Sequence, residues 1–328
     1  MMRNLPALSM LLLAAISHAT DIQVTDTQGN PVSTAMVTAS PLQLPPADLS
    51  DDGYPPHGVT NTAAVTLTRF TDADGRASLP DAEDDRQVRV RAQGYVDATV
   101  TAEPGVASLA VSLQTMTPEQ YIASFPSNVW LSQLSFGGDA ELKKTFQLNC
   151  AFCHQQASPF MRNERTVEQW LAVFERMNSY GARLPTEDHR AIAEHLQREL
   201  RALREQPETV PEPRAWGEFL AGVSMTEWPI GDGFSQMHDF LLHPNGMVYV
   251  GDNLFDRLYE VEPDSGEYTV YKVPHRADDE VGGILGNRFT VFPKMYNYMG
   301  VHSFAVSPRD GNIFITPSMQ QALLEFNP

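Results

Sequence analysis

The chain has little cysteine and little positive charge. Only 2 of its 328 residues are cysteine, so they can form at most one internal disulfide, and a zinc site would need further ligands of another kind. Lys and Arg together number 23, against 41 Asp and Glu, and the formal net charge is −18. This balance argues against nucleic acid or an anionic membrane surface as the main partner. It predicts a well-solvated protein whose partners are neutral or cationic.

Long apolar runs are also lacking, apart from one at the start. Residues 5–16 are mostly apolar and follow Arg3, but they are too few to cross a bilayer. Ala19 closes a Ser-His-Ala sequence, in which small residues stand where a signal peptidase recognises them. Residues 1–19 are therefore predicted to be a signal peptide, with an uncleaved anchor as the alternative. The mature protein is expected to be periplasmic or secreted, with no membrane span after signal cleavage.

The chain is long enough for two or three domains. Its patterns of apolar residues change along the sequence and predict a multidomain α+β fold. The expected order is a β-sandwich over residues 20–115, an all-α haem domain over 116–205, a proline-rich linker over 206–214 and an incomplete set of β-propeller blades over 215–328.

Short alternating runs broken by Gly, Asn and Pro predict strands and turns in the first segment. Three motifs carry a resemblance to the carboxypeptidase regulatory-like domain: D-x-x-G-x-P-V from Asp26 to Val32, T-D-x-D-G-x-A-x-L over residues 71–79, and A-x-G-Y over 92–95. The resemblance implies a small prealbumin-like β-sandwich that serves as a binding or structural module. A Pro- and Asp-rich insertion over about 41–58 interrupts it and is expected to be a mobile loop.

Asp72 and Asp74 stand in an Asp-x-Asp-Gly sequence within this segment. The two carboxylates could be calcium ligands. A hairpin turn explains the same residues more simply, because Asp and Gly are the residues that such turns need. The turn is the favoured interpretation.

The two cysteines lie three residues apart and are followed directly by a histidine. Cys150, Cys153 and His154 form C-x-x-C-H, the attachment pattern of c-type haem. Two thiols one helical turn apart can reach the two vinyl groups of a porphyrin and form thioethers, and the adjacent imidazole then points at the iron. The sequence thus predicts one covalent haem c, attached through Cys150 and Cys153, with His154 as an axial ligand of the iron.

Three other uses of a C-x-x-C pair compete with haem: a redox pair, a structural disulfide and half of a zinc site. A redox pair is expected in an α/β context, which is absent here, and the chain has no further cysteine for zinc. The predicted export favours haem, because covalent attachment keeps the group bound in an open, oxidising compartment.

Helical spacing surrounds this motif. Apolar side chains recur at helical intervals over residues 139–148, 166–177 and 186–204. Trp170 and Phe174 among them are expected to wall a pocket or, alternatively, to be simple core residues. The segment resembles a small class I cytochrome c, in which one helix precedes the motif and a C-terminal helix packs across it. That resemblance implies a methionine as the second axial ligand. An iron with His and Met ligands has no open position, which favours electron transfer over oxygen chemistry.

Met177 is the favoured second ligand because it lies just before the last predicted helix; alternatively, it is a core residue of an amphipathic helix. Met161 is the alternative, although it follows His154 by only seven positions. So short a segment can hardly pass around the edge of the haem to place Met161 on the face opposite His154. His189 or His195 would instead give an iron with two histidine ligands. Met177 follows His154 by 23 positions, which is short for the family.

The last segment repeats itself. Three blocks recur in one order at offsets of 64 or 65 residues: 238–244 with 302–308, 245–250 with 310–315, and 258–263 with 323–328. Each unit reads as strands joined by an Asn-Gly or Asp-Gly turn, the pattern of a β-propeller blade. The repeat resembles the propeller of virginiamycin B lyase (streptogramin lyase), with an insertion near 277–298.

About one and a half blades are present, whereas closure of a propeller needs at least about four. The sequence is therefore expected to be a piece of a longer protein; alternatively, these strands pack on the other domains or on a second chain.

His238 and His302 occupy one position in successive repeats. They could line a central channel and bind metal or act as a base, as His does in the lyase. The favoured interpretation is a packing histidine that bonds a neighbouring strand, because fold alone does not carry function.

Together these features predict an exported c-type cytochrome that transfers electrons to or from a redox partner protein, with β modules that dock partners or ligands. The first alternative is a periplasmic oxidoreductase, whose propeller holds a small-molecule ligand and passes its electrons to the haem. The second is a streptogramin lyase-like enzyme with an accessory haem. No catalytic residue can be assigned from the sequence.

Overall fold

The computed structural model describes residues 19–42, 60–62, 65–151, 156–179, 181–231, 235–283 and 297–328. The predicted signal peptide lies outside these ranges apart from Ala19, as do most of the two predicted insertions. Contacts divide the chain into two compact units. The first consists of Met1–Leu42, Thr66–Thr115 and Trp216–Thr226, and the second of Gln43–Val65, Met116–Ala215 and Glu227–Pro328.

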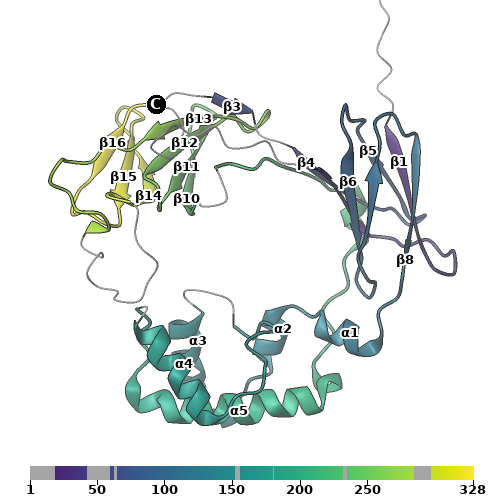
Figure 1. The fold of residues 1–328 in the computed structure, drawn as a ribbon, viewed down its shortest axis with the longest axis horizontal. Helices are drawn as coiled ribbons and strands as arrows, with labels where there is room; N and C mark the ends of the chain where they lie inside the picture. The colour runs from purple at the N-terminus through teal and green to yellow at the C-terminus, as the bar shows by residue number, and fades with distance from the viewer. Residues whose placement is uncertain are drawn as a thin grey trace, which may run out of the picture. The chain divides into compact units, whose positions relative to one another are not determined.

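The first unit contains two β-sheets (Figure 1). The smaller sheet has the order β5-β1-β8 and consists of β1 (Thr20–Asp26), β5 (Arg76–Leu79) and β8 (Ser108–Leu113). The larger has the order β7-β6-β2-β4-β9 and consists of β2 (Met36–Pro41), β4 (Thr66–Phe70), β6 (Arg86–Arg91), β7 (Ala98–Ala102) and β9 (Ser224–Glu227). Buried and exposed residues alternate along the strands, as in β6, where Val88 and Val90 are buried on either side of the exposed Arg89.

One strand of this unit comes from a distant part of the sequence. β9 extends the larger sheet beside β4, although its residues were expected among the propeller blades. A 3-10 helix, η4 (Glu218–Gly222), precedes it, and the Trp216 ring meets Phe70 edge-on at 6.3 Å between centroids. An edge strand offers unpaired N–H and C=O groups to any segment that can reach it. Hydrophobic patterning therefore does not predict this pairing.

The Asp-x-Asp-Gly sequence forms the turn between β4 and β5. The Asp72 carboxylate accepts hydrogen bonds from the backbone N–H groups of Asp74 and Arg76, both at 2.9 Å. Gly75 has a φ of +74°, and a Cβ there would lie 2.4 Å from the Val24 carbonyl oxygen, so only glycine fits. The Asp72 carboxylate thus serves the turn, as the favoured interpretation expected.

The second unit contains five α-helices among the described residues: α1 (Pro118–Ala123), α2 (Ser127–Ser132), α3 (Ala140–Cys150), α4 (Val167–Ser179) and α5 (His189–Glu205). The 3-10 helices η1 (Phe136–Gly138), η2 (Thr186–Asp188) and η3 (Pro207–Thr209) join or follow them. The longer helices share a core in which Phe146, Trp170, Phe174, Ile192 and Leu196 are almost fully buried. Within α4 and α5 these residues recur four positions apart, on one face of each helix.

An independent all-α cytochrome c domain, as predicted over residues 116–205, is not present, and the predicted fold class is wrong on this point. The described residues form four separate β-sheets and five α-helices. Contacts group the helices in one compact unit with the C-terminal strands. Helical periodicity indicates which face of a helix is buried, whereas a domain boundary depends on the contacts of the whole chain.

Two antiparallel sheets correspond to the repeated sequence. The first has β10 (Met237–Leu242), β11 (Val248–Asp252), β12 (Arg257–Val261) and β13 (Glu267–Lys272) in chain order, with β3 (Thr60–Thr62) as its outermost strand (Figure 1). The second has β14 (Val301–Val306), β15 (Ile313–Pro317) and β16 (Leu324–Phe326). The matched blocks fall on matching strands, because β10 pairs with β11 and β11 with β12 as β14 pairs with β15 and β15 with β16.

A buried carboxylate links the two sheets of the repeat. Asp256, in the turn between β11 and β12, is 3% exposed and has a φ of +52°. Its carboxylate accepts hydrogen bonds from the backbone N–H groups of Tyr298, Met299 and Gly300 at 2.6 to 3.2 Å. Burial raises the pKa of Asp256, and these donors oppose that rise by favouring the ionised form.

The Asp256→Ala variant is expected to lose about 3 kcal/mol or more of unfolding free energy, because it leaves three N–H groups, two of them buried, without an acceptor. Asp256→Asn keeps one acceptor oxygen and tolerates the positive φ, so its loss should be smaller. Urea unfolding measures the loss, and hydrogen exchange at residues 298–300 should accelerate with it. The exposed Asp264→Ala is the control and should change stability by no more than about 0.5 kcal/mol. Equal losses at both positions would refute this role of Asp256.

Candidate functional site

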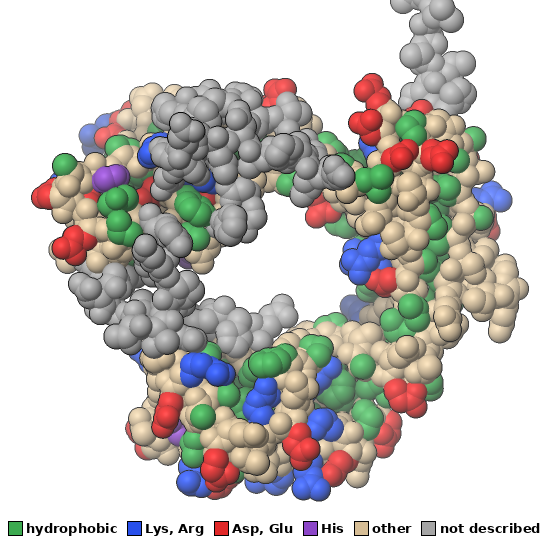
Figure 2. All heavy atoms as spheres, viewed as in Figure 1, with side chains coloured by type: hydrophobic (Ala, Val, Ile, Leu, Met, Phe, Trp, Pro, Cys, Tyr) green, Lys and Arg blue, Asp and Glu red, His purple; other side chains and the backbone are tan. Residues whose placement is uncertain are grey.

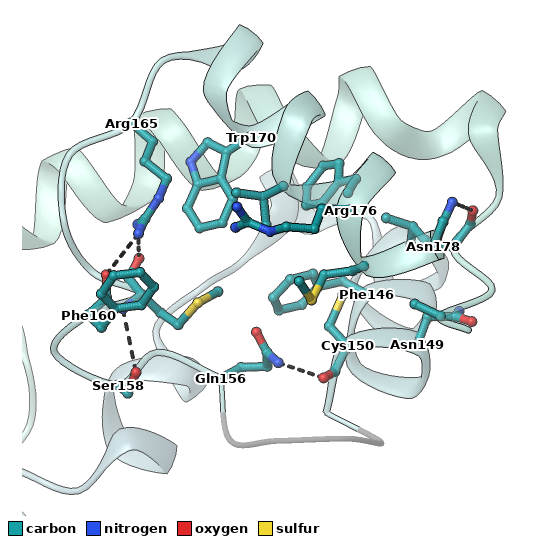
Figure 3. A pocket seen from close by; sticks show the side chains of 16 residues that line it. Phe146, Asn149, Cys150, Gln156, Ser158, Phe160, Arg165, Trp170, Arg176 and Asn178 are labelled. Carbon is teal, nitrogen blue, oxygen red and sulfur yellow. Dashed lines mark hydrogen bonds between the residues drawn. The ribbon is translucent and has the colours of Figure 1, made fainter. Parts of the chain in front are cut away.

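A cavity of about 320 Å³ lies among helices α3 and α4 and the segments that precede and follow α4 (Figure 3). Its wall is mostly apolar and includes Phe146, Trp170, Val173, Phe174 and Leu184. The volume falls within the range of about 300–1,000 Å³ that is usual for sites of small molecules and cofactors. The stacked rings of Trp170 and Phe174, 6.1 Å apart between centroids, form part of this wall, as the sequence predicted for a pocket.

Helix α3 brings Cys150 to this cavity. The helix begins at Ala140 behind the N-cap Asp139, whose carboxylate accepts a hydrogen bond from the Leu142 N–H at 2.9 Å. It ends at Cys150, one turn after the buried Phe146, so both side chains lie on the face that lines the cavity. Cys153 and His154 lie outside the described residues.

Met177 lies in the last turn of α4 and lines the same cavity. The Ala182 N–H donates to the Met177 carbonyl and the Gly181 N–H to the Asn178 carbonyl, both at 3.0 Å, while Gly181 has a φ of +100°. This is a Schellman motif, in which glycine takes the left-handed conformation that ends a helix. The motif fixes the backbone of the turn that carries Met177.

Met161 also lines the cavity, from the segment before α4. The Arg165 guanidinium holds that segment by donating to the backbone carbonyls of Phe160, Met161 and Asn163 at 3.1 to 3.2 Å. A reciprocal capping box between Thr166 and Gln169 then starts α4. Both predicted methionines are therefore brought to one cavity with Cys150, on two different elements.

The alternative histidine ligands do not line the cavity. His189 is buried, and its Nε2 lies 3.2 Å from the Leu184 carbonyl oxygen and 3.3 Å from Asn178 Nδ2. The His195 Nδ1 lies 2.8 Å from Glu199 Oε1, and its ring stacks on Phe136. These contacts occupy both rings within the helical core.

Asn178, Gln156, Arg165 and Arg176 also line the cavity, and the sequence did not single them out. The Asn178 Oδ1 atom is buried and has no hydrogen-bond partner among the described residues. Burial lowers the pKa of Arg165, and the nearby positive charges of Arg176 and Arg204 lower it further. Sequence spacing could have indicated Asn178, which follows Met177, and Arg176, which precedes it. It could not indicate Arg165, whose position depends on the path of the segment before α4.

The residues of this cavity fit a haem. A covalent haem needs a thiol beside an apolar pocket and a ligand atom for the iron, and Cys150, the aromatic wall and two methionine side chains provide these. A buried acceptor without a hydrogen-bond donor, such as Asn178 Oδ1, destabilises a protein interior. Its presence here is consistent with a cavity that binds a ligand.

The histidines of the repeat are not among the residues that line this cavity. His238 and His302 stand at the β-bulges of β10 and β14, and their ring centroids are 3.9 Å apart. The His238 Nδ1–H donates to the His302 carbonyl at 3.1 Å. Burial lowers the pKa of His302, and the charge of His238 lowers it further. A histidine that bonds a neighbouring strand is the interpretation favoured from the sequence.

Comparisons with known proteins give no family for this chain. No protein-family model matches it, and no curated protein matches its sequence. None of the described helices is long and apolar enough to cross a membrane. The described residues also contain no group of three or more His, Cys, Asp or Glu side chains placed to hold a metal ion.

Proposed function

We propose that the protein carries one covalent haem c and transfers single electrons outside the cytoplasm. Cys150 and Cys153 would attach the haem, and His154 and Met177 would bind its iron, with Met161 as the alternative to Met177. The observation that carries the proposal is the C-x-x-C-H motif, whose first cysteine ends α3 beside an apolar cavity with both candidate methionines in its wall.

The chain's own residues would hold the group and exclude water. The aromatic wall of Trp170 and Phe174 provides apolar surface against a macrocycle, and Phe146 adds a further ring to the cavity wall beside Cys150. The Schellman motif at Gly181 sets the position of Met177 before any ligand binds. When bound, the haem supplies reversible one-electron chemistry, and a methionine ligand raises its reduction potential.

Electron transfer is favoured over the two enzyme alternatives. A site with two protein ligands on the iron has no open position for oxygen or substrate, which argues against chemistry at the iron itself. In the described repeat, the His238 ring donates to the backbone carbonyl of His302 in β14, which supports a packing role. The function of the β modules is proposed to be the docking of a redox partner or of a small ligand.

The test uses the exported, haem-loaded full chain under anaerobic conditions. Stopped-flow mixing with a soluble mono-haem cytochrome of higher potential should oxidise the reduced protein rapidly, as seen in its α-band. Addition of primary alcohols, aldehydes or amines alone should not reduce the oxidised protein. Reduction by one of these substrates would favour the oxidoreductase alternative. A purified protein without covalent haem would refute the proposal.

A further inference from the structure

Two arginines lie on the wall of the cavity that holds Cys150. Arg165 places its guanidinium carbon 4.9 Å from the ring centroids of both Trp170 and Phe160. Arg176, on α4, also lines the cavity, and in Figure 3 its guanidinium extends toward Trp170. The influence of the Arg176 charge on Arg165 agrees with their lying near one another. The cavity thus has two positive charges beside an aromatic wall.

No carboxylate of the described residues neutralises this pair. Arg165 donates to three backbone carbonyls and Arg176 makes no ion pair, whereas Arg190, Arg198 and Arg201 on α5 each have a glutamate partner. Residues 139–205 contain ten Lys or Arg and ten Asp or Glu, in a chain whose net charge is −18. Figure 2 shows Lys and Arg side chains interspersed with Asp and Glu over the helices on the face in view.

Uncompensated arginines beside a ligand cavity favour an anionic ligand group. A guanidinium is planar and binds a carboxylate with two parallel hydrogen bonds, and it stays charged when partly buried. Arg165 is already held in place by its carbonyl partners, so binding would cost it little side-chain entropy, and further N–H donors of its fork remain available.

We propose that Arg165 and Arg176 bind the carboxylates of the group in this cavity, which for a haem are its two propionates. The inference rests on the proposed function, because it takes the bound group to be haem. Arg165 and Arg176 then set the orientation of the macrocycle about the thioether links. Their positive charges also raise the reduction potential, because they stabilise the reduced iron, which has one positive charge fewer.

The experiment compares haem-loaded, exported full-length variants: Arg176→Gln, Arg176→Lys, Arg165→Gln and, as a matched control, Arg190→Gln. Arg176 has no described side-chain partner and is exposed, so its variants should fold as the parent does. Spectroelectrochemistry measures the midpoint potential. Resonance Raman spectroscopy measures the propionate-bending band, which reports hydrogen bonding to the carboxylates and not charge in general.

Arg176→Gln is expected to lower the midpoint potential and to shift the propionate band. Arg176→Lys should keep the midpoint potential close to that of the parent but still shift the propionate band. An ammonium replaces the positive charge but not the two parallel hydrogen bonds of a guanidinium. Arg165→Gln should also lower the potential and shift the band, and it additionally removes the hydrogen bonds that hold the segment before α4. Arg190→Gln should change neither signal. Raising the salt concentration should shrink the effect of Arg176 on the potential.

Two outcomes separate failure of this inference from failure of the proposed function. If the parent carries covalent haem and Arg176→Gln matches Arg190→Gln in both signals, the inference is wrong and the haem proposal stands. If the parent carries no covalent haem, the proposed function is wrong and this inference is wrong with it.

Discussion

Replacing both Cys150 and Cys153 with alanine is expected to abolish covalent haem attachment. Thioethers to these two residues are the only covalent links that the C-x-x-C-H motif allows, and the chain has no other cysteine. The variant should be exported with the haem-attachment machinery and separated on a denaturing gel. Haem stain per unit of protein should fall from full intensity to background. Either single substitution should leave one thioether and a reduced stain.

The matched control is Asn149→Ala, which alters the last turn of α3 and the cavity wall without removing a thiol. Among the described residues, the Asn149 side chain donates only to the Thr145 carbonyl within the helix, so its loss should leave attachment intact. Haem stain that persists when both cysteines are alanine would show that attachment does not use them. Loss of stain in Asn149→Ala as well would indicate that the variants simply fail to fold.

Met177→Ala is expected to remove the weak near-infrared absorption band of a methionine–iron bond in the oxidised protein. Covalent haem should remain, because the thioethers do not depend on this residue. The midpoint potential should fall, since loss of the thioether sulfur removes the ligand that stabilises the reduced iron. Absorption spectroscopy and spectroelectrochemistry on one sample measure both changes.

Met161→Ala is the control for this prediction, because Met161 lines the same cavity and loses the same volume. It should keep the near-infrared band and change the potential little. Loss of the band in Met161→Ala alone would transfer the ligand role to Met161. A parent without the band would point to a second histidine ligand, although His189 and His195 are engaged elsewhere in the core.

Local patterns predicted the helices near the candidate site well. The apolar spacing over 139–148 and 166–177 corresponds to α3 and α4, because burial of one helical face repeats every three or four residues. The start of the third helix was less accurate: Thr186 was expected as its N-cap, but a 3-10 turn, η2, comes first and α5 begins at His189. Helix ends depend on a few competing hydrogen bonds, which sequence spacing does not rank.

The repeat was equally visible, because matching turns and strands need matching residues. The blocks at 238–244 and 302–308 fall on β10 and β14, and each strand has its bulge at the repeated histidine. The sequence could not predict that β3 would pair with β13 or that β9 would pair with β4. Those strands are short and join sheet edges. The unpaired backbone N–H and C=O groups at an edge can pair with many different sequences, so the pairing is not specified by side-chain pattern.

The sequence by itself determined two thiols and an adjacent histidine at a spacing that one helical turn makes meaningful, whereas the role expected of the methionines downstream came from the family resemblance. Only the tertiary structure decided which of these side chains share a cavity, that Arg165 and Arg176 lie at its wall, and that the helices do not form a unit of their own. The reason is physical. Motif spacing acts within one or two helical turns, whereas a cavity wall and a domain boundary are set by packing between segments far apart in the chain.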